Sequence, residues 1–119
     1  MNKYLTYHYL VRIGLGVIFV AHALIAFFIP DEFIELLENS FVSGLLPMDP
    51  QTFVATVIVL NDSIVGLLLI SGYKTRLVAT WATLWLIGVM IVIGADLFEI
   101  LEHIGLVFIS VALIFESRH

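Results

Sequence analysis

The chain has 119 residues, a net charge of −5 and no cysteine, and 61% of its residues are hydrophobic. Soluble domains are only about 45–50% apolar, so this composition indicates one small domain that lies mostly in a membrane. The lack of cysteine excludes disulfide exchange, thiolate catalysis and cysteine-ligated zinc or iron–sulfur clusters within this chain. No basic cluster suggests binding to nucleic acid.

Four apolar segments are candidates for membrane-spanning helices: residues 11–29, 53–72, 77–93 and 97–115. Each is roughly 17–20 residues long, close to the ~20 that cross the ~30 Å of a bilayer core. They predict an all-α fold, an integral membrane four-helix bundle formed by a single domain over residues 1–119. The fourth segment is the weakest because Glu99, Glu102 and His103 occupy its first turns. The alternative is a three-span protein with a partly inserted end.

The first segment is preceded by Lys3 and interrupted near its start by Arg12, so we expect a retained membrane anchor rather than a cleaved signal peptide. With four crossings, all the basic residues fall on one side of the membrane: Lys3, Arg12, Lys74, Arg76 and Arg118. The positive-inside rule then predicts that both termini and the loop around residues 74–76 are cytoplasmic. A three-span chain would place Arg118 outside.

The only substantial loop of this scheme, at about residues 31–46, is predicted to form a short amphipathic helix on the outer surface. Pro30, Asp31 and Glu32 are typical of a helix start. The apolar residues at helical spacing are Phe33, Leu36, Leu37 and Phe41, and they lie opposite Glu32, Glu35 and Glu38. The helix is either a surface cover or a lid over a cavity between the spans.

Ionisable residues from three segments share one depth in this scheme. Counted from the outer ends of the spans, His22 lies roughly 10 Å deep, Asp62 roughly 14 Å, Glu102 roughly 8 Å and His103 roughly 9 Å. A charged carboxylate at bilayer mid-depth costs roughly 2.5–3.5 kcal/mol, so Asp62 needs a proton, a partner or a water-filled cavity. Glu99, Glu102 and His103 share one helix face, which should turn inward. We therefore expect these side chains to meet inside the bundle.

We interpret Asp62 and His22 as the catalytic pair, with Asp62 accepting or donating a proton and His22 sharing it or donating a hydrogen bond to a quinone oxygen. Asn61, Glu99, Glu102 and His103 are the candidate ligand-binding residues. The alternative is that these polar groups hold the helices together or mark a wet helix end.

No metal site is predicted, because a di-iron bundle needs a Glu-x-x-His motif from each of two helices and the chain offers only the cluster at Glu99–His103. The sequence does not identify a cofactor, and a quinone is one candidate. A haem between His22 and His103 is a weaker alternative. We interpret Trp81 and Trp85 as aromatic residues that contact lipid or pack between helices. The alternative is that they form a platform for a quinone ring.

Two stretches resemble the DoxX-like family of small membrane proteins. In residues 12–22 the resemblance rests on Arg12, the following glycines and His22. In residues 62–77 it rests on an ordered set: Asp62, Gly66, Gly72, Thr75 and Arg76. The chain departs from the family where Asp62 replaces a frequent glutamate, where no lysine follows His22, and where Phe115–Arg118 replaces a glycine-rich end.

The resemblance implies four spans, and it implies kinship with proteins some of which are subunits of thiosulfate:quinone oxidoreductases or associate with other membrane oxidoreductase complexes. The leading hypothesis is therefore a small membrane subunit associated with a quinone-linked or other membrane oxidoreductase complex. The alternatives are a non-catalytic structural subunit of a larger assembly, or a small haem-binding or proton-conducting protein. The expected partners are the lipid bilayer and other membrane subunits or further copies of the chain.

Overall fold

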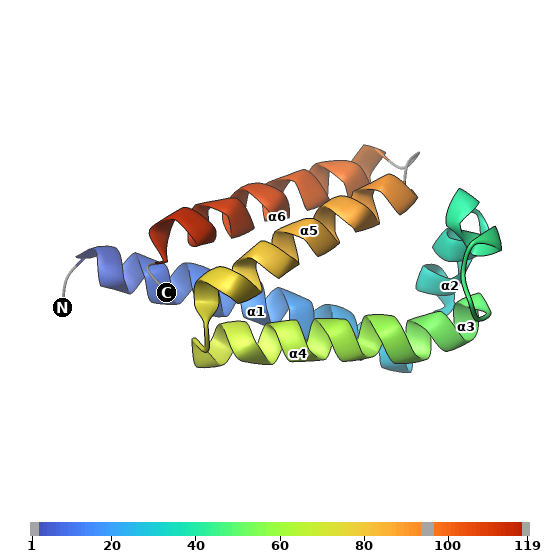
Figure 1. The fold of residues 1–119 in the computed structure, drawn as a ribbon, viewed down its shortest axis with the longest axis horizontal. Helices are drawn as coiled ribbons and strands as arrows, with labels where there is room; N and C mark the ends of the chain where they lie inside the picture. Colours follow the sequence, from blue (N-terminus) through green and yellow to red (C-terminus); the bar gives the residue numbers. More distant parts are fainter. Residues whose placement is uncertain (1–2, 94–96, 118–119) are drawn as a thin grey trace.

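A computed structural model describes residues 3–93 and 97–117, and within them it contains helices and no strand. Figure 1 shows the arrangement of the long helices, which are α1 (Lys3–Phe28), α4 (Val59–Ser71), α5 (Thr75–Ile93) and α6 (Leu97–Glu116). The short elements between α1 and α4 are α2 (Asp31–Glu38), η1 (Phe41–Gly44), α3 (Pro50–Phe53) and η2 (Val54–Ile58). The predicted all-α bundle is confirmed.

Three helical segments in the described part of the chain are long and apolar enough to cross a membrane: Thr6–Phe28, Pro50–Ser71 and Thr75–Val92. The protein is therefore an integral membrane protein. The fourth candidate, α6, has 20 residues and packs along α5. It carries Glu99, Glu102 and Glu116, so the fourth crossing stays a prediction.

The second spanning segment is one continuous helical path with an irregular start. Asp49 caps it, because its Oδ1 accepts a hydrogen bond of 2.7 Å from the Thr52 backbone N–H. Residues Val54–Ile58 form a π-helix, which inserts extra backbone into the turn and changes the direction of the side chains that follow. The path ends at Gly72, whose φ of 82° lies in the left-handed region that favours glycine.

The helices α1 and α4 touch backbone to backbone. A Cβ atom placed on Gly16 would lie 2.8 Å from the carbonyl oxygen of Gly66, and one placed on Gly66 would lie 2.6 Å from Val20 Cγ2. Both distances are too short for any side chain, so glycine at the two positions allows the close approach that suits helix packing in lipid. By contrast, a Cβ at Gly14, also on α1, would meet nothing within 4 Å.

The helices α5 and α6 form the second pair, joined by a buried hydroxyl contact. Thr83 Oγ1 and Ser110 Oγ lie 2.7 Å apart, and either can be the donor. The hydroxyl that accepts in this contact is free to donate to a carbonyl oxygen of its own helix, that of Ala79 for Thr83 or Val107 for Ser110. Figure 1 shows that the pair α5–α6 and the pair α1–α4 meet near the chain termini and diverge toward α2. A main core fills the converging half, with Leu15, Phe19, Leu69, Ala79 and Leu113 among its members.

The amphipathic helix predicted over residues 31–46 is observed as two shorter helices, α2 and η1. The break lies at Ser40, whose hydroxyl bonds the Leu37 carbonyl oxygen at 2.9 Å and accepts from the Val42 N–H at 3.3 Å. A serine side chain that satisfies backbone groups in this way competes with continued α-helix. Leu37 is buried in a second small core with Ala26 and Val54, which holds α2 against the ends of α1 and the second span.

Candidate functional site

A cavity of about 610 Å³ occupies the space between the diverging helix pairs. Its volume falls in the range of about 300–1,000 Å³ that is typical of small-molecule sites. The ionisable side chains that line it come from α1, α2, α4 and α6: His22, Glu32, Asp62, Glu99, Glu102 and His103. The structure thus brings together every predicted site residue except Asn61, which lies just outside the lining.

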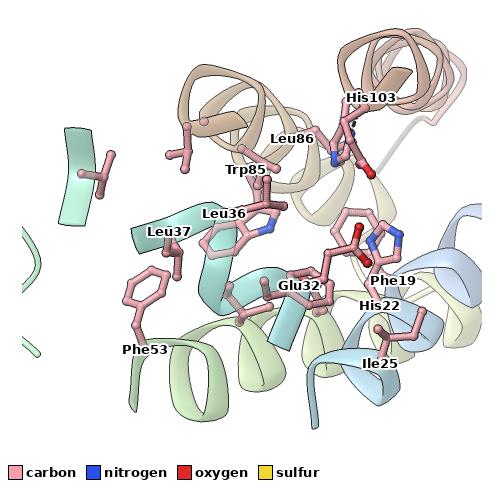
Figure 2. A pocket seen from close by; sticks show the side chains of 18 of the residues that line it. Phe19, His22, Ile25, Glu32, Leu36, Leu37, Phe53, Trp85, Leu86 and His103 are labelled. Carbon is pink, nitrogen blue, oxygen red and sulfur yellow. Dashed lines mark hydrogen bonds between the residues drawn. The ribbon is translucent and has the colours of Figure 1, made fainter. Parts of the chain in front are cut away.

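The two histidines face each other across the cavity from different helices. The ring centroids of His22 on α1 and His103 on α6 lie 6.4 Å apart, and the ring planes are tilted by 31°. Figure 2 shows His22 beside Phe19 on one wall and His103 on the other. A ligand in the cavity can therefore contact both imidazoles.

The tautomer of His103 follows from its hydrogen bond. Nδ1 lies 2.7 Å from the backbone carbonyl oxygen of Glu99, and a carbonyl oxygen can only accept. Nδ1 therefore carries a hydrogen, and in the neutral imidazole Nε2 is left as the acceptor. His103 is buried, so it supplies a fixed ring whose Nε2 can accept a proton or a hydrogen bond.

Asp62 is the most deeply buried carboxyl group described in the cavity wall, with 3% of its surface exposed. Its Oδ1 accepts a hydrogen bond of 3.1 Å from Asn61 Nδ2. The Asn61 side-chain oxygen in turn accepts a bond of 2.7 Å from Trp81 Nε1. Asn61 is thus held between Asp62 and α5 and does not line the cavity, so its predicted role as a ligand-binding residue has no direct contact to support it.

The helix α2 forms one end of the cavity. Phe33, Leu36 and Leu37 line it, as the lid interpretation requires. Glu32 lines it too, and Figure 2 shows its side chain directed from α2 into the cavity. The sequence assigned Glu32 to the outer acidic face. Glu32 and Leu36 are four residues apart, so they lie on the same side of a helix. This spacing is the sequence feature that indicates that Glu32 faces the cavity together with Leu36.

Aromatic residues of α5 are the other lining groups that the site prediction left out. Trp81 and Trp85 both contribute to the cavity wall, although 51% of Trp81 is also exposed on the outer surface. Their i, i+4 spacing places them on one helix face, and the sequence alone favoured a packing role for them. Apart from its carboxyl and imidazole groups, the wall is largely aliphatic and aromatic.

Arg12 lies outside the cavity, as expected, but it is turned into the protein. Its guanidinium occupies the space beside Gly72, where a Cβ atom would lie 2.6 Å from Nη1. The Arg12 Cζ atom lies 4.9 Å from the centre of the Tyr9 ring. Arginine near the last carbonyl groups of α4 complements the negative end of that helix. The contact joins the two sequence stretches, 12–22 and 62–77, that carry the family resemblance.

Within residues 3–93 and 97–117, no three histidine, aspartate or glutamate side chains are grouped closely enough to hold a metal ion. His22 and His103 form a pair only. The arrangement is suited to exchange protons and to hold a largely apolar molecule that carries hydrogen-bonding oxygens.

The model of one protein family, described as DoxX, matches residues 8–95. The match covers both motif stretches, Asp62 and His22, and it stops before α6, which supplies Glu99, Glu102 and His103. Searches among curated proteins and among solved structures gave no match.

Proposed function

Because the chain belongs to the DoxX family of membrane proteins, we propose that it is a small membrane subunit of a quinone-linked or other membrane oxidoreductase assembly and that its cavity accepts a quinone ring. The observation that carries the proposal is the convergence of Asp62 and two histidines, from three helices, on one largely apolar cavity. Fold membership alone does not transfer chemistry, so the proposal rests on this site.

The chemistry of a quinone matches the lining. A quinone ring is apolar on its faces and has carbonyl oxygens that accept hydrogen bonds, and its reduction to a quinol consumes two electrons and two protons. Phe19 and Trp85 contact the ring faces in this proposal, and His22 donates a hydrogen bond to a ring oxygen. In quinone reduction Asp62 gives up one proton, and the second comes from water at the outer surface through Glu32 or Glu102 and the histidines. Quinol oxidation reverses both transfers. The electrons come from, or go to, a redox-active partner subunit.

The proton route of the proposal runs from the outer surface. Glu32 and Glu102 are exposed and also line the cavity, and in this proposal they connect water at the outer surface with the interior. His103 Nε2 and His22 lie beyond them, and Asp62 is the buried end. Ionisable groups in a membrane interior are costly and commonly mark such relays, which supports a functional role over simple packing.

The topology belongs to the same proposal: four crossings, both termini in the cytoplasm, and the cavity in the outer half of the membrane. The basic residues around the α4–α5 turn and the acidic residues of α2 support this orientation. Because the chain has no cysteine, a single cysteine introduced by mutation reports directly on which side of the membrane its position lies. A membrane-impermeant maleimide should label Glu38→Cys on intact cells and Lys74→Cys only after permeabilisation. The reverse pattern would overturn the orientation.

Binding is tested on the purified protein with a short-chain quinone. Trp81 and Trp85 line the cavity, so bound quinone should quench their fluorescence. We expect weaker quenching in His22→Ala and unchanged quenching in Thr80→Val, which alters an exposed threonine on α5. If quenching is equally weak in the wild type, the cavity is not a quinone site.

Activity is tested on the complex purified with its partner subunits. Asp62→Asn and His22→Ala should both lower the rate of quinone reduction or quinol oxidation. Unchanged rates in both variants would remove the proton-handling role. Stoichiometric assembly with larger subunits but without quinone would favour the structural alternative, and a haem band in the optical spectrum would favour the haem alternative.

A further inference from the structure

Three side chains form a directed chain of hydrogen bonds between α5 and α4. Trp81 Nε1 donates to Asn61 Oδ1 at 2.7 Å, and Asn61 Nδ2 donates to Asp62 Oδ1 at 3.1 Å. The two ends of an asparagine amide are hard to distinguish by shape, so their assignment follows from the partners. An indole N–H can only donate. The Asn61 oxygen must therefore face Trp81, and its amino group must face Asp62.

This orientation restricts the carboxyl group of Asp62. With an N–H donor aimed at it, Oδ1 acts as an acceptor whether the carboxyl group is ionised or protonated. A proton on Asp62 is then held by Oδ2. If the Asn61 amide were reversed, its oxygen would face Oδ1 and would instead favour a proton there. The indole of Trp81 therefore decides, through Asn61, which oxygen of Asp62 carries the proton.

We propose that Trp81 and Asn61 are positioning residues that fix the site of protonation of Asp62 on Oδ2. This assigns a function to a tryptophan that composition alone attributes to lipid contact, and it moves Asn61 from ligand binding to orientation. It deepens the proposed function, because an acid whose proton stays on one oxygen presents it to a ligand in one direction. The bond lies between two neighbouring helices, so α5 controls the chemistry of a residue on α4.

The first test measures the infrared absorption of the Asp62 carboxyl group, isolated by subtracting the spectrum of Asp62→Asn. Trp81→Phe keeps the aromatic ring but removes the N–H, so the Asn61 amide is free to turn. We expect the carbonyl band of protonated Asp62 to shift to higher frequency and to broaden, because Oδ1 loses a fixed donor. Asn61→Leu should give the same shift, and the double variant should add nothing to it.

Trp85→Phe is the matched control for this measurement, because Trp85 lines the same cavity one turn further along α5. We expect it to leave the Asp62 band in place. An unchanged band in both Trp81→Phe and Asn61→Leu, in protein that retains its helical circular dichroism, would overturn the proposal. A band shifted equally by Trp85→Phe would also overturn it, because the effect would then reflect the cavity in general.

The second test follows the two indole N–H signals of the 15N-labelled protein by NMR. Trp81→Phe removes and thereby assigns one of them. Asn61→Leu should move the Trp81 signal and leave the Trp85 signal in place, whereas movement of neither would contradict the hydrogen bond. Both tests are made without quinone, so they can succeed even if quinone binding fails. If quinone does bind, loss of turnover in Trp81→Phe with an unchanged quinone affinity, measured by quenching of the remaining Trp85, separates proton positioning from binding.

Discussion

The half of the bundle where the helices converge and the half where they diverge are built from different residue types, although α4 takes part in both. In the converging half, Gly66 touches Gly16 of α1 through the backbone. In the diverging half, Asp62 and His22 line a cavity. Asp62 and Gly66 are four residues apart, so they share one face of α4 and are separated by about 6 Å along its axis.

The difference shows how a small membrane protein combines cohesion with a polar site. Lipid tails are as apolar as the helix surfaces, so the helices associate by close packing rather than by the hydrophobic effect. The glycine contact supplies that packing and leaves no space for polar side chains. One helical turn away, the pair α5–α6 separates from the pair α1–α4 enough for carboxyl and imidazole groups to face one another and to avoid the lipid. The following substitutions test this contrast.

The largest effect is expected for Gly66→Ala. The added methyl group would lie 2.6 Å from Val20 Cγ2 and 2.8 Å from the Gly16 oxygen, so α1 and α4 must move apart. Overpacking of this kind costs about 1–3 kcal/mol of the free energy of unfolding, measured by denaturant titration in detergent. Gly14→Ala on α1 is the control, because its methyl group meets nothing within 4 Å. Equal stability of both variants would contradict a tight glycine contact.

A smaller loss is expected when the Thr83–Ser110 pair is broken. Thr83→Val leaves the buried Ser110 hydroxyl without its partner on α5, and interhelical hydrogen bonds in membranes are worth about 0.6 kcal/mol on average. Thr80→Val is the control, since the Thr80 hydroxyl donates to the Arg76 carbonyl oxygen of its own helix and the residue is exposed. The unfolding free energies of Thr83→Val, Ser110→Ala and the double variant should reveal coupling, and strict additivity would argue against the contact.

In the diverging half, a glycine-to-alanine substitution should stabilise the protein instead of destabilising it. Gly88 lies on α5 in the cavity wall, and a Cβ there meets nothing within 4 Å. Gly88→Ala should therefore raise the free energy of unfolding by about 0.4–1 kcal/mol, because it reduces the freedom of the unfolded chain without a clash. Destabilisation in the same denaturant titration would mean that this half of the bundle is as closed as the other.

The smallest effect concerns Asp49, which caps the start of the second span outside the membrane. Hydrogen bonds from the Thr52 side chain and from its backbone N–H lower the pKa of the Asp49 carboxyl group. A lowered pKa in the folded state contributes stability above the unfolded pKa, and this contribution is lost as the pH falls through the folded pKa. At neutral pH the free energy of unfolding should therefore be slightly higher for the wild type than for Asp49→Asn. Unfolding measurements at decreasing pH should show this difference disappear. A difference independent of pH would exclude this charge effect.

The layer of ionisable residues could be derived from the sequence because depth in a membrane depends mainly on residue number along each helix. His22, Asp62, Glu102 and His103 were placed at one depth and do line one cavity. The rotation of each helix about its own axis is harder to predict from the sequence. Asn61 precedes Asp62 by one residue, about 100° around the helix, and the structure turns it toward Trp81. Their functional roles stay predictions.

The amino-acid composition and hydropathy alone determined that this is an all-helical membrane protein, because backbone groups in lipid must be satisfied within each segment. Two motif stretches were enough to identify the family. Only the tertiary structure decided that Gly16 and Gly66 form the helix contact, that α2 ends at Glu38 and lines one end of the cavity, and that Trp81 holds Asn61 against Asp62. These features depend on how helices rotate and cross, which is set by contacts between segments that are distant in the sequence.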